Sequence, residues 1–487
     1  MRPTESFPGP KSTPSSRPQP CSAPESAPER QAEPGAPGES EGQVALAVIA
    51  GVEIERLDDA SMAVGTTPDG RAVMVAGALP GEVLTMRVVR TSRRTGLLYG
   101  QIQEVTRPSP DRVPSPCANF LRCGGCDLLH ANTEAQHRFK ERKVSSALAS
   151  LGVRVSKIVP APANFGYRAF AKFVVETSGS LGSYGPHSHD VVSMSGCVVH
   201  APEIEAIAEN VRAWLHARAG PLDLRYVLMR ASTLTRTVAI TLVSRREEAE
   251  GLTSLVEHLK DDARVARIGL HANATEGDAL LGDAPVRTNF DRGPLEERLD
   301  DIVHYIVEGA FSQVNPTAAA RAYRLVSQLA MPVVGARVLD LYAGSGGIAL
   351  RLLADGALHV VAVESSAAAI EAARNAAAAN REGGLSLYAE PVEAFLRRMP
   401  PPESRYDVVV ANPPRKGLSP TVLEGLARLS WERLVYMSCN PSSLARDLED
   451  LGRLDPRIRF VSAHPVDLFP QTKHVETVVL AERVAQR

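Results

Sequence analysis

The C-terminal part of the sequence alternates between strand-like and helix-like segments, and this order restricts the fold more than any other feature. Residues 337–342 read as a strand, a glycine-rich turn follows at 344–347, and 348–354 reads as a helix. The order then repeats, with a helix expected at 366–380 and strands at 359–364, 406–411, 433–437, 459–462 and 475–480. Strands that alternate with helices build a doubly wound, mostly parallel sheet. We therefore expect an α/β fold here.

The glycine-rich turn reads DLYAGSGG at 340–347, and its glycines let the backbone turn tightly and approach a ligand closely. Glu364 ends the next expected strand, where a carboxylate can accept hydrogen bonds from both hydroxyls of a ribose. A dinucleotide site would instead have the spacing G-x-G-x-x-G. The spacing found here resembles the S-adenosylmethionine loop of class I methyltransferases.

The motif NPPRKG at 412–417 follows another expected strand. An aromatic residue after Asn-Pro-Pro would indicate methylation of an exocyclic amine, and a cysteine there would indicate a cytosine C5 enzyme. Arg415 occupies that position. The motif therefore marks the substrate end of the sheet but favours neither of these two chemistries.

Cys439 lies where the strand at 433–437 opens into a loop, and open α/β sheets bind ligands at the carboxyl ends of their strands. Beside a methyl donor, a thiolate could add to C6 of a uracil ring and so make C5 nucleophilic. A base must afterwards remove the proton from C5. His474 and Glu476, at the start of the last strand, are both candidates, and the local pattern does not choose between them.

The first 42 residues are rich in Pro, Ser, Glu and Gly and contain few aliphatic side chains. They cannot bury enough surface to offset the entropy cost of ordering, so a disordered tail that includes Cys21 is expected. From 43 to 106 the sequence predicts a small β-barrel, because turn signals separate strand-like runs at 44–55, 72–76, 82–89 and 97–105. Four arginines near its third strand suit a solvated edge and a phosphate-contacting surface equally: Arg87, Arg90, Arg93 and Arg94.

Residues 107–320 mix strand-like and helix-like segments, with helices expected near 133–151 and 201–217. This region contains four of the six cysteines: Cys117, Cys123, Cys126 and Cys197. Three of them lie within ten positions, a spacing that in a large cytosolic chain argues for a metal site or catalysis rather than for disulfides. Four thiolates suit zinc or an iron–sulfur cluster, and the spacing does not separate the two.

Length and composition set wider limits. The chain has 487 residues, 44% of them hydrophobic, which is enough for packed cores in about three domains. Its formal net charge of −2 gives no global sign of a nucleic-acid partner, although a basic patch can be local. No apolar run approaches the roughly 18 residues of a membrane span, and the N-terminus lacks the apolar core of a secretion signal. We expect a cytoplasmic protein without membrane association.

Several motifs together resemble the RNA (uracil-5-)-methyltransferases: SCNPSSLARDL, NPPRKGL, LFPQTKHVETVVLAER, FSQVN and DLYAGSGGIAL. Further upstream, ALPGE and PSPDRVPSPC look like the TRAM domain and cysteine segment of the ribosomal RNA members. The resemblance covers about 44–487. It implies a class I methyltransferase domain at 321–487, preceded by an OB-like TRAM barrel at 43–106 and a mixed α+β iron–sulfur domain at 107–320.

Residue by residue, the resemblance implies Cys439 as the nucleophile and Glu476 rather than His474 as the proton acceptor. It implies S-adenosylmethionine contacts from Gln313, Tyr342, Gly344, Glu364 and Asn412, the last of which is most often Asp in the family. It also implies a [4Fe-4S] cluster on Cys117, Cys123, Cys126 and Cys197.

The implied activity is methylation of uracil C5 in RNA. Members that act on transfer RNA generally lack both N-terminal additions, so 23S ribosomal RNA is the favoured substrate and tRNA the alternative. A small-molecule methyltransferase and a non-catalytic RNA-folding factor are rival interpretations. Nothing in the sequence indicates an obligate protein partner.

Overall fold

The computed structural model describes residues 47–484, apart from short gaps at 177, 187, 219–221, 250, 276–279, 282–285, 308–311 and 399–404. The expected tail at 1–42, with Cys21, lies outside the described residues. In the part of the chain that is described, no helix has both the length and the apolarity that a membrane crossing requires.

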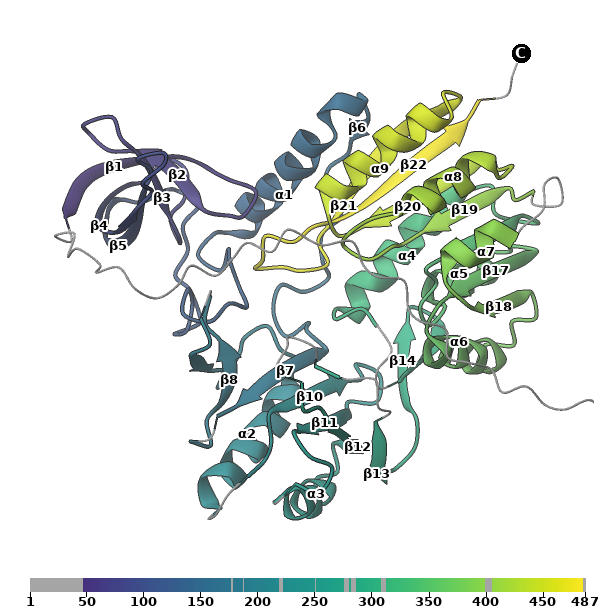
Figure 1. Cartoon of the computed structure of the whole chain (residues 1–487), viewed down its shortest axis with the longest axis horizontal. Coiled ribbons are helices and arrows are strands. Elements are labelled where there is room, and N and C mark those ends of the chain that lie inside the picture. Colours follow the sequence, from purple (N-terminus) through teal and green to yellow (C-terminus); the bar gives the residue numbers. More distant parts are fainter. Residues whose placement is uncertain are drawn as a thin grey trace, which may run out of the picture. The chain divides into compact units, whose positions relative to one another are not determined.

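Among the described residues, five strands near the N-terminus close into a barrel in the order β1-β2-β3-β5-β4 (Figure 1). Their bounds are β1 Val48–Leu57, β2 Ala63–Thr66, β3 Ala72–Val75, β4 Val83–Thr91 and β5 Leu98–Arg107. The predicted small barrel is therefore confirmed. Strand β2 was not predicted, because it is short and contains Gly65. A side chain at Gly65 would lie 2.1 Å from the carbonyl oxygen of Glu53, so this close strand pairing depends on glycine.

A second sheet has the strand order β13-β12-β11-β10-β7-β8-β9 within the described ranges. Its strands are β7 Phe170–Val175, β8 Leu181–Tyr184, β9 Val191–Ser193, β10 Tyr226–Ala231, β11 Val238–Ser244, β12 Val265–Ala272 and β13 Arg287–Asp291. Helices α2 (Pro202–Ala217) and α3 (Leu252–Lys260) share a hydrophobic core with it. The helix expected at 201–217 is thus present as α2.

The third sheet has the order β18-β17-β16-β19-β20-β22-β21-β6 in the described part of the chain. Its strands are β6 Arg154–Val155, β16 Arg337–Leu341, β17 His359–Glu364, β18 Leu385–Ala389, β19 Val408–Ala411, β20 Arg433–Ser438, β21 Ile458–Val466 and β22 Glu476–Arg483. The strands β16 to β20 run parallel, whereas β22 is antiparallel to both neighbours. Every strand predicted in this region is present. Strand β18 was not predicted, because it lies at an edge and is not fully buried.

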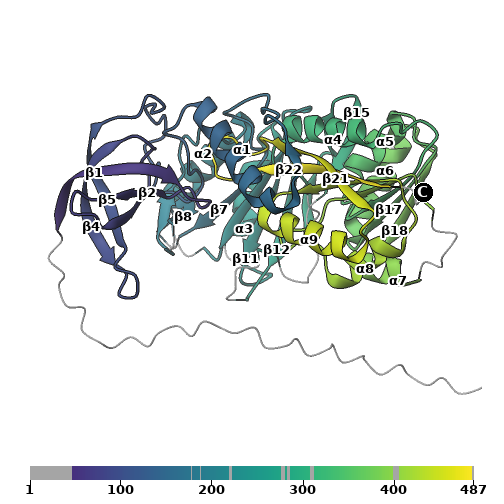
Figure 2. The same cartoon turned by 90° about the horizontal axis from the view of Figure 1, so that it is seen from above.

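Helices cover both faces of this third sheet, as Figures 1 and 2 show. One face packs against α4, α5 and α6, and the other against α7, α8 and α9. Their bounds are α4 Pro316–Ala330, α5 Gly347–Ala354, α6 Ala367–Ala379, α7 Val392–Arg398, α8 Pro420–Arg428 and α9 Pro441–Leu454. Since successive side chains of a strand point to opposite faces, Leu339 joins one core and Val338 the other. The doubly wound arrangement predicted from the sequence is confirmed.

A segment far upstream also contributes to this third sheet. Helix α1 (Thr133–Ala147) is followed by a short 3-10 turn and by β6, which pairs parallel with β21. Asn132 begins α1 by accepting a hydrogen bond from the backbone N–H of Ala135 at 2.8 Å, and Val144 and Leu148 pack into the core of the sheet. The domain limits given above remain a prediction, but this segment belongs structurally to the C-terminal sheet.

Candidate active site

The register of the third sheet brings Cys439 and Glu476 together. The ends of β16, β19 and β20 lie side by side because these strands are parallel neighbours. Strand β22 begins at the same edge, where Thr477 pairs with Ser438. Cys439 directly follows Ser438 and Glu476 directly precedes Thr477, so the two predicted catalytic residues are neighbours across the ladder.

Glu476 is a buried carboxyl group, with only 3% of its surface exposed. Burial raises its pKa to about 8, against the opposing influence of the Arg415 guanidinium. Cys439 is partly buried, and burial raises the pKa of its thiol, as does the neighbouring Glu476. Arg415 opposes this rise and hydrogen-bonds to the sulfur. The site therefore combines a thiol, a carboxyl group that binds protons near neutral pH, and a fixed positive charge.

Arg415 was used in the sequence only to exclude two chemistries, and its position beside the two catalytic candidates was not anticipated. Its backbone carbonyl accepts hydrogen bonds from Asn440 Nδ2 at 3.1 Å and from Ser443 Oγ at 3.0 Å. The loop after β19 is therefore joined to the loop that contains Cys439. In the sequence, each of these two loops directly follows an expected strand, and this shared position could have indicated that they lie close together.

The glycine-rich loop is held to the end of β17 by Glu364. One carboxylate oxygen of Glu364 accepts from Gly344 N at 3.1 Å, and the other accepts from Ser366 N at 2.8 Å. Tyr342 has a φ of 61°, a backbone conformation that costs a non-glycine residue free energy and that is common at functional sites. Open space lies beside Gly344, where an added side chain would meet nothing within 4 Å.

The loop fits a nucleoside cofactor in its donor and acceptor chemistry. Oε2 of Glu364 accepts from Gly344 N and keeps a lone pair for a ribose hydroxyl, whereas Oε1 accepts from both Ser365 Oγ and Ser366 N. Asn412 lies at the end of β19, where its backbone N–H donates to the carbonyl of Leu341 at 3.2 Å. Asp340 is fully buried beneath the loop, and burial raises its pKa to about 8, partly offset by the backbone N–H of Ala349.

Tyr323, on α4, lies against the glycine-rich loop and close enough to Glu476 to be affected by its charge, and it was not predicted from the sequence. A side chain at Gly347 would come within 2.5 Å of its ring, so the ring lies directly against the loop. Its hydroxyl hydrogen-bonds to Gln313, and burial, Glu476 and Asp340 raise its pKa. The sequence offered one indication of its importance, a tyrosine within an alanine-rich segment.

The predicted metal ligands Cys117, Cys123, Cys126 and Cys197 are all half-buried free thiols. They lie close enough to affect one another electrostatically, and burial together with the other cysteines raises the pKa of Cys126 to about 12. Within the described residues, the metal-ligating atoms that gather within 4.8 Å of one another are those of Cys197, His200 and Glu205. Glu205 accepts from Cys197 N at 3.1 Å and contacts His200 Nδ1 at 2.7 Å, so hydrogen bonds account for this trio.

Comparison with solved structures shows which class of protein this fold belongs to. The crystal structure of Pyrococcus abyssi tRNA (uracil-54, C5)-methyltransferase, in complex with S-adenosyl-L-homocysteine, matches with a TM-score of 0.69 and 25% identity. The match covers 89% of this chain and 99% of that one. The fold is therefore that of an S-adenosylmethionine-dependent RNA methyltransferase.

The particular family follows from the sequence comparison. The model of the tRNA (uracil-5-)-methyltransferase family matches residues 135–484, and the chain belongs to this family. Two relatives described as uncharacterized RNA methyltransferases are each 32% identical to it. The relative from Gloeobacter violaceus matches over 85% of this chain and 92% of its own, and that from Geobacter sulfurreducens over 88% of each.

One comparison bears on the expected substrate. We expected members that act on transfer RNA generally to lack both N-terminal additions, but the Pyrococcus abyssi enzyme matches 89% of this chain. Residues 107–487 alone cannot supply that share, so the match extends into the barrel region. The N-terminal additions therefore do not separate a ribosomal RNA substrate from a transfer RNA substrate.

Proposed function

We propose that this enzyme methylates C5 of a uridine in RNA through a transient covalent bond between Cys439 and C6 of the base. The observation that carries the proposal is the pairing of Ser438 with Thr477, which sets the thiol beside the buried Glu476 at the ligand-binding edge of the sheet. Arg415 adds a positive charge that favours the thiolate.

The proposed reaction forms and breaks one bond between the protein and the base. The Cys439 thiolate adds to C6, and the electron pair of the C5–C6 double bond moves into an enolate. S-adenosylmethionine, when bound, would supply an electrophilic methyl group; C5 would accept it, and S-adenosylhomocysteine would leave with the electron pair of the broken S–CH3 bond. Glu476 then takes the proton from C5, the C5–H electron pair re-forms the double bond, and the thiolate leaves C6. A base with a pKa of about 8 is suited to accept this proton near neutral pH.

The cofactor would be held by Gln313, Tyr342, Gly344, Glu364 and Asn412. Glu364 keeps the loop in place through Gly344 and retains a lone pair on Oε2 for the ribose. Asn412 can donate a hydrogen bond through its amide, which the Asp more usual in the family cannot do.

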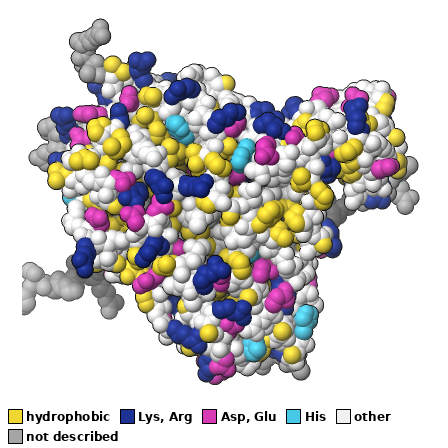
Figure 3. Space-filling model, turned by 180° about the vertical axis from the view of Figure 1, so that it is seen from behind, with side chains coloured by type: hydrophobic (Ala, Val, Ile, Leu, Met, Phe, Trp, Pro, Cys, Tyr) yellow, Lys and Arg dark blue, Asp and Glu magenta, His cyan; other side chains and the backbone are white. Residues whose placement is uncertain are grey.

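The substrate base must leave its stack to reach Cys439, as in other enzymes that act on nucleic-acid bases. We assign RNA contacts to the barrel, which we interpret as an OB-like TRAM domain. Arg90, Arg93 and Arg94 are exposed at the end of β4 and in the turn that follows. Figure 3 shows lysine and arginine side chains spread over the displayed face among acidic and apolar ones. Local basic groups, rather than one uniformly positive surface, would therefore bind the phosphates.

The four cysteines suit a [4Fe-4S] cluster better than zinc. Four sulfurs around a tetrahedral zinc would lie about 3.8 Å apart, because each Zn–S bond is about 2.3 Å. Among the described residues, the group within 4.8 Å contains only one of these cysteines. The cluster would be structural and would organise RNA binding, since no step above requires electron transfer. A Cys123→Ser protein that folds and keeps full RNA affinity would refute this role.

We favour 23S ribosomal RNA as the substrate, in the cytoplasm, because of the resemblance to the ribosomal RNA members. Transfer RNA is the second candidate, since the matched Pyrococcus abyssi enzyme acts on it. Mapping 5-methyluridine in ribosomal and transfer RNA, with and without the gene, distinguishes the two.

The proposed chemistry is tested with RNA that contains 5-fluorouridine, because fluorine at C5 cannot be removed as a proton. A stable protein–RNA adduct that needs both S-adenosylmethionine and Cys439 is expected. Absence of that adduct with RNA that the enzyme methylates would reject the covalent mechanism. A non-catalytic RNA-folding factor would bind the RNA without forming an adduct, and a small-molecule enzyme would methylate extracts freed of RNA.

A further inference from the structure

The segment 467–475, here called the strap, joins β21 to β22 and leads directly into Glu476. It forms no regular helix or strand, yet much of it is buried. Its position must therefore come from contacts with other parts of the chain. Many of these contacts come from α1 and from the cysteine segment, both more than 300 residues upstream.

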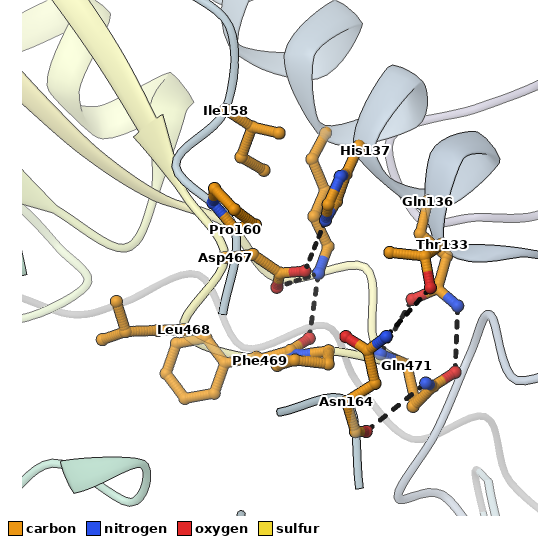
Figure 4. Close-up of polar contacts among 12 residues, drawn as sticks. Thr133, Gln136, His137, Ile158, Pro160, Asn164, Asp467, Leu468, Phe469 and Gln471 are labelled. Atoms are coloured by element: carbon orange, nitrogen blue, oxygen red, sulfur yellow. Dashed lines mark hydrogen bonds and ion pairs between the residues drawn. The ribbon is translucent and has the colours of Figure 1, made fainter. Parts of the chain in front are cut away.

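Helix α1 holds the beginning of the strap through a buried ion pair. Lys140 Nζ donates to Asp467 Oδ1 at 2.6 Å and to the carbonyl of Phe469 at 2.9 Å. His137 contacts the other oxygen of Asp467 at 3.3 Å. Figure 4 shows Asp467 pointing toward α1, with these contacts dashed. Since Lys140 and Asp467 are almost completely buried, each depends on the other for charge compensation.

The middle of the strap is held by a reciprocal amide pair. Gln136 Nε2 donates to Gln471 Oε1 at 2.9 Å, and Gln471 N donates to Gln136 Oε1 at 2.9 Å, as Figure 4 shows. Gln471 has a φ of 70°, so its backbone conformation needs outside support. Tyr167 adds a hydrogen bond from its hydroxyl to the carbonyl of Pro470 at 2.8 Å.

The end of the strap is held by the residue that follows Cys126. Asp127 N and Leu128 N both donate to the carbonyl of Gln471, at 3.0 and 2.9 Å. In return, Lys473 N donates to Asp127 Oδ2 at 3.1 Å, and Lys473 Nζ donates to Asp127 Oδ1 at 2.9 Å. Asp127 thus makes backbone and side-chain bonds to the strap three to five residues before Glu476.

We propose that Asp127 is a positioning residue that couples the cysteine segment to the proton-removal step by fixing the strap and hence the orientation of Glu476. The inference rests on the proposed role of Glu476. Cys439 is placed independently, by β20 and by the bonds of Asn440 at the start of α9. Loosening the strap should therefore slow release of the methylated product more than formation of the covalent adduct.

The test is Asp127→Asn, which keeps the size of the side chain and removes its charge. Rapid-quench single turnovers with RNA should show adduct formation within about threefold of the parent and release slowed about tenfold or more, because small misplacements of a catalytic group cost up to about a hundredfold. A methylated protein–RNA species should accumulate. Amide exchange in 468–475 should rise, while iron content and visible absorbance stay unchanged.

Asp223→Asn is the matched control, because Asp223 is also a partly buried carboxylate in an ion pair, in its case with Arg246 at 3.2 Å. It should change neither release nor exchange in the strap. If Asp127→Asn does not fold, Lys473→Gln removes the same ion pair at its more exposed partner. This variant should likewise slow product release more than adduct formation.

If Asp127→Asn slows adduct formation and product release equally, or leaves amide exchange in the strap unchanged, the proposed coupling between Asp127 and Glu476 is wrong. The exchange measurement also separates this inference from the proposed function. If the parent forms no adduct, the covalent mechanism is wrong, whereas the exchange comparison still decides whether Asp127 fixes the strap.

Discussion

A buried carboxyl group lies at each end of the strap, since Asp467 is its first residue and Glu476 directly follows its last, and the two groups are held in opposite ways. Asp467 is only 1% exposed, and although burial favours its neutral form, His137 and Lys140 keep its pKa below the ordinary value. Glu476 is 3% exposed, and burial raises its pKa to about 8, with Arg415 as the opposing charge. Asp467 therefore stays ionised and anchors the chain, whereas Glu476 can exchange a proton near neutral pH.

Burial alone therefore does not decide whether a carboxyl group is ionised at neutral pH. An adjacent lysine and histidine turn one buried acid into a fixed charge. Glu476 has Arg415 as its opposing charge, and desolvation still raises its pKa to about 8. Substitutions at and around the two groups test this contrast.

Cys439→Ala should abolish turnover, by about 10⁴-fold or more, because no other group can activate C5. Its free energy of unfolding should change by less than about 1 kcal/mol, since the thiol is only partly buried. Methyl transfer to RNA and urea unfolding check the two statements. Normal product formation by Cys439→Ser would contradict the assignment of Cys439 as the nucleophile.

Glu476→Gln should lower turnover by about 10²- to 10⁴-fold, the usual contribution of a general base. The methylated covalent species should accumulate with ordinary RNA, visible as a protein band shifted by bound RNA on a denaturing gel. His474→Gln is the control, because burial lowers the pKa of His474 to about 4 and His474 is the rival base. Accumulation in the His474 variant instead would reverse the choice between them.

Asp467→Asn should destabilise the protein by about 3–5 kcal/mol, because it leaves the buried charge of Lys140 without its partner. Asp111→Asn is the matched control, because Asp111 lies in the loop ahead of α1 and pairs with a residue of that same helix. Asp111 pairs with the exposed Arg138, so its loss should cost less than about 1 kcal/mol. Urea unfolding measures both losses of unfolding free energy. Equal losses would show that the buried Asp467–Lys140 pair stabilises the protein no more than the exposed Asp111–Arg138 pair does.

The contributions of the two carboxyl groups to the free energy of unfolding should also depend on pH in opposite ways. The folded-state pKa of Glu476, about 8, is above its ordinary 4.5, so the unfolded chain loses this proton first. Its contribution should therefore fall by up to about 1.4 kcal/mol per pH unit between about 4.5 and 8. The stability difference between Glu476→Gln and the parent should grow across that window and then level off. The contribution of Asp467, with a lowered pKa, should be present above pH 3.8 and be lost only as the pH falls through its folded value.

Tyr323→Phe should have the smallest effect. It removes the hydroxyl that bonds to Gln313 but keeps the ring against Gly347. A loss of about 1 kcal/mol, or about fivefold, is expected in S-adenosylmethionine affinity, the usual cost of one hydrogen bond. Calorimetric titration measures it, and an unchanged affinity would show that Gln313 does not need this partner.

The sequence predicted the third sheet well because its strands are buried on both sides and read as continuous apolar runs. Strand ends also located Cys439 and the two candidate bases, His474 and Glu476, because ligands bind at the carboxyl ends of parallel strands. The choice of Glu476 came from the family resemblance. Arg415, Tyr323 and Asp127 were missed for a different reason. Their roles depend on partners from other elements, and no local pattern encodes a pairing between residues as far apart as Lys140 and Asp467.

Strand β6 has a consequence for how the chain can be divided. It lies at the edge of the C-terminal sheet although it is synthesised some 300 residues before its neighbour β21. A fragment that starts at residue 321 would expose β21 as an unpaired edge, a template for association with other chains. It would also leave Asp467 without Lys140. Shortened versions intended to be stable should therefore begin ahead of α1.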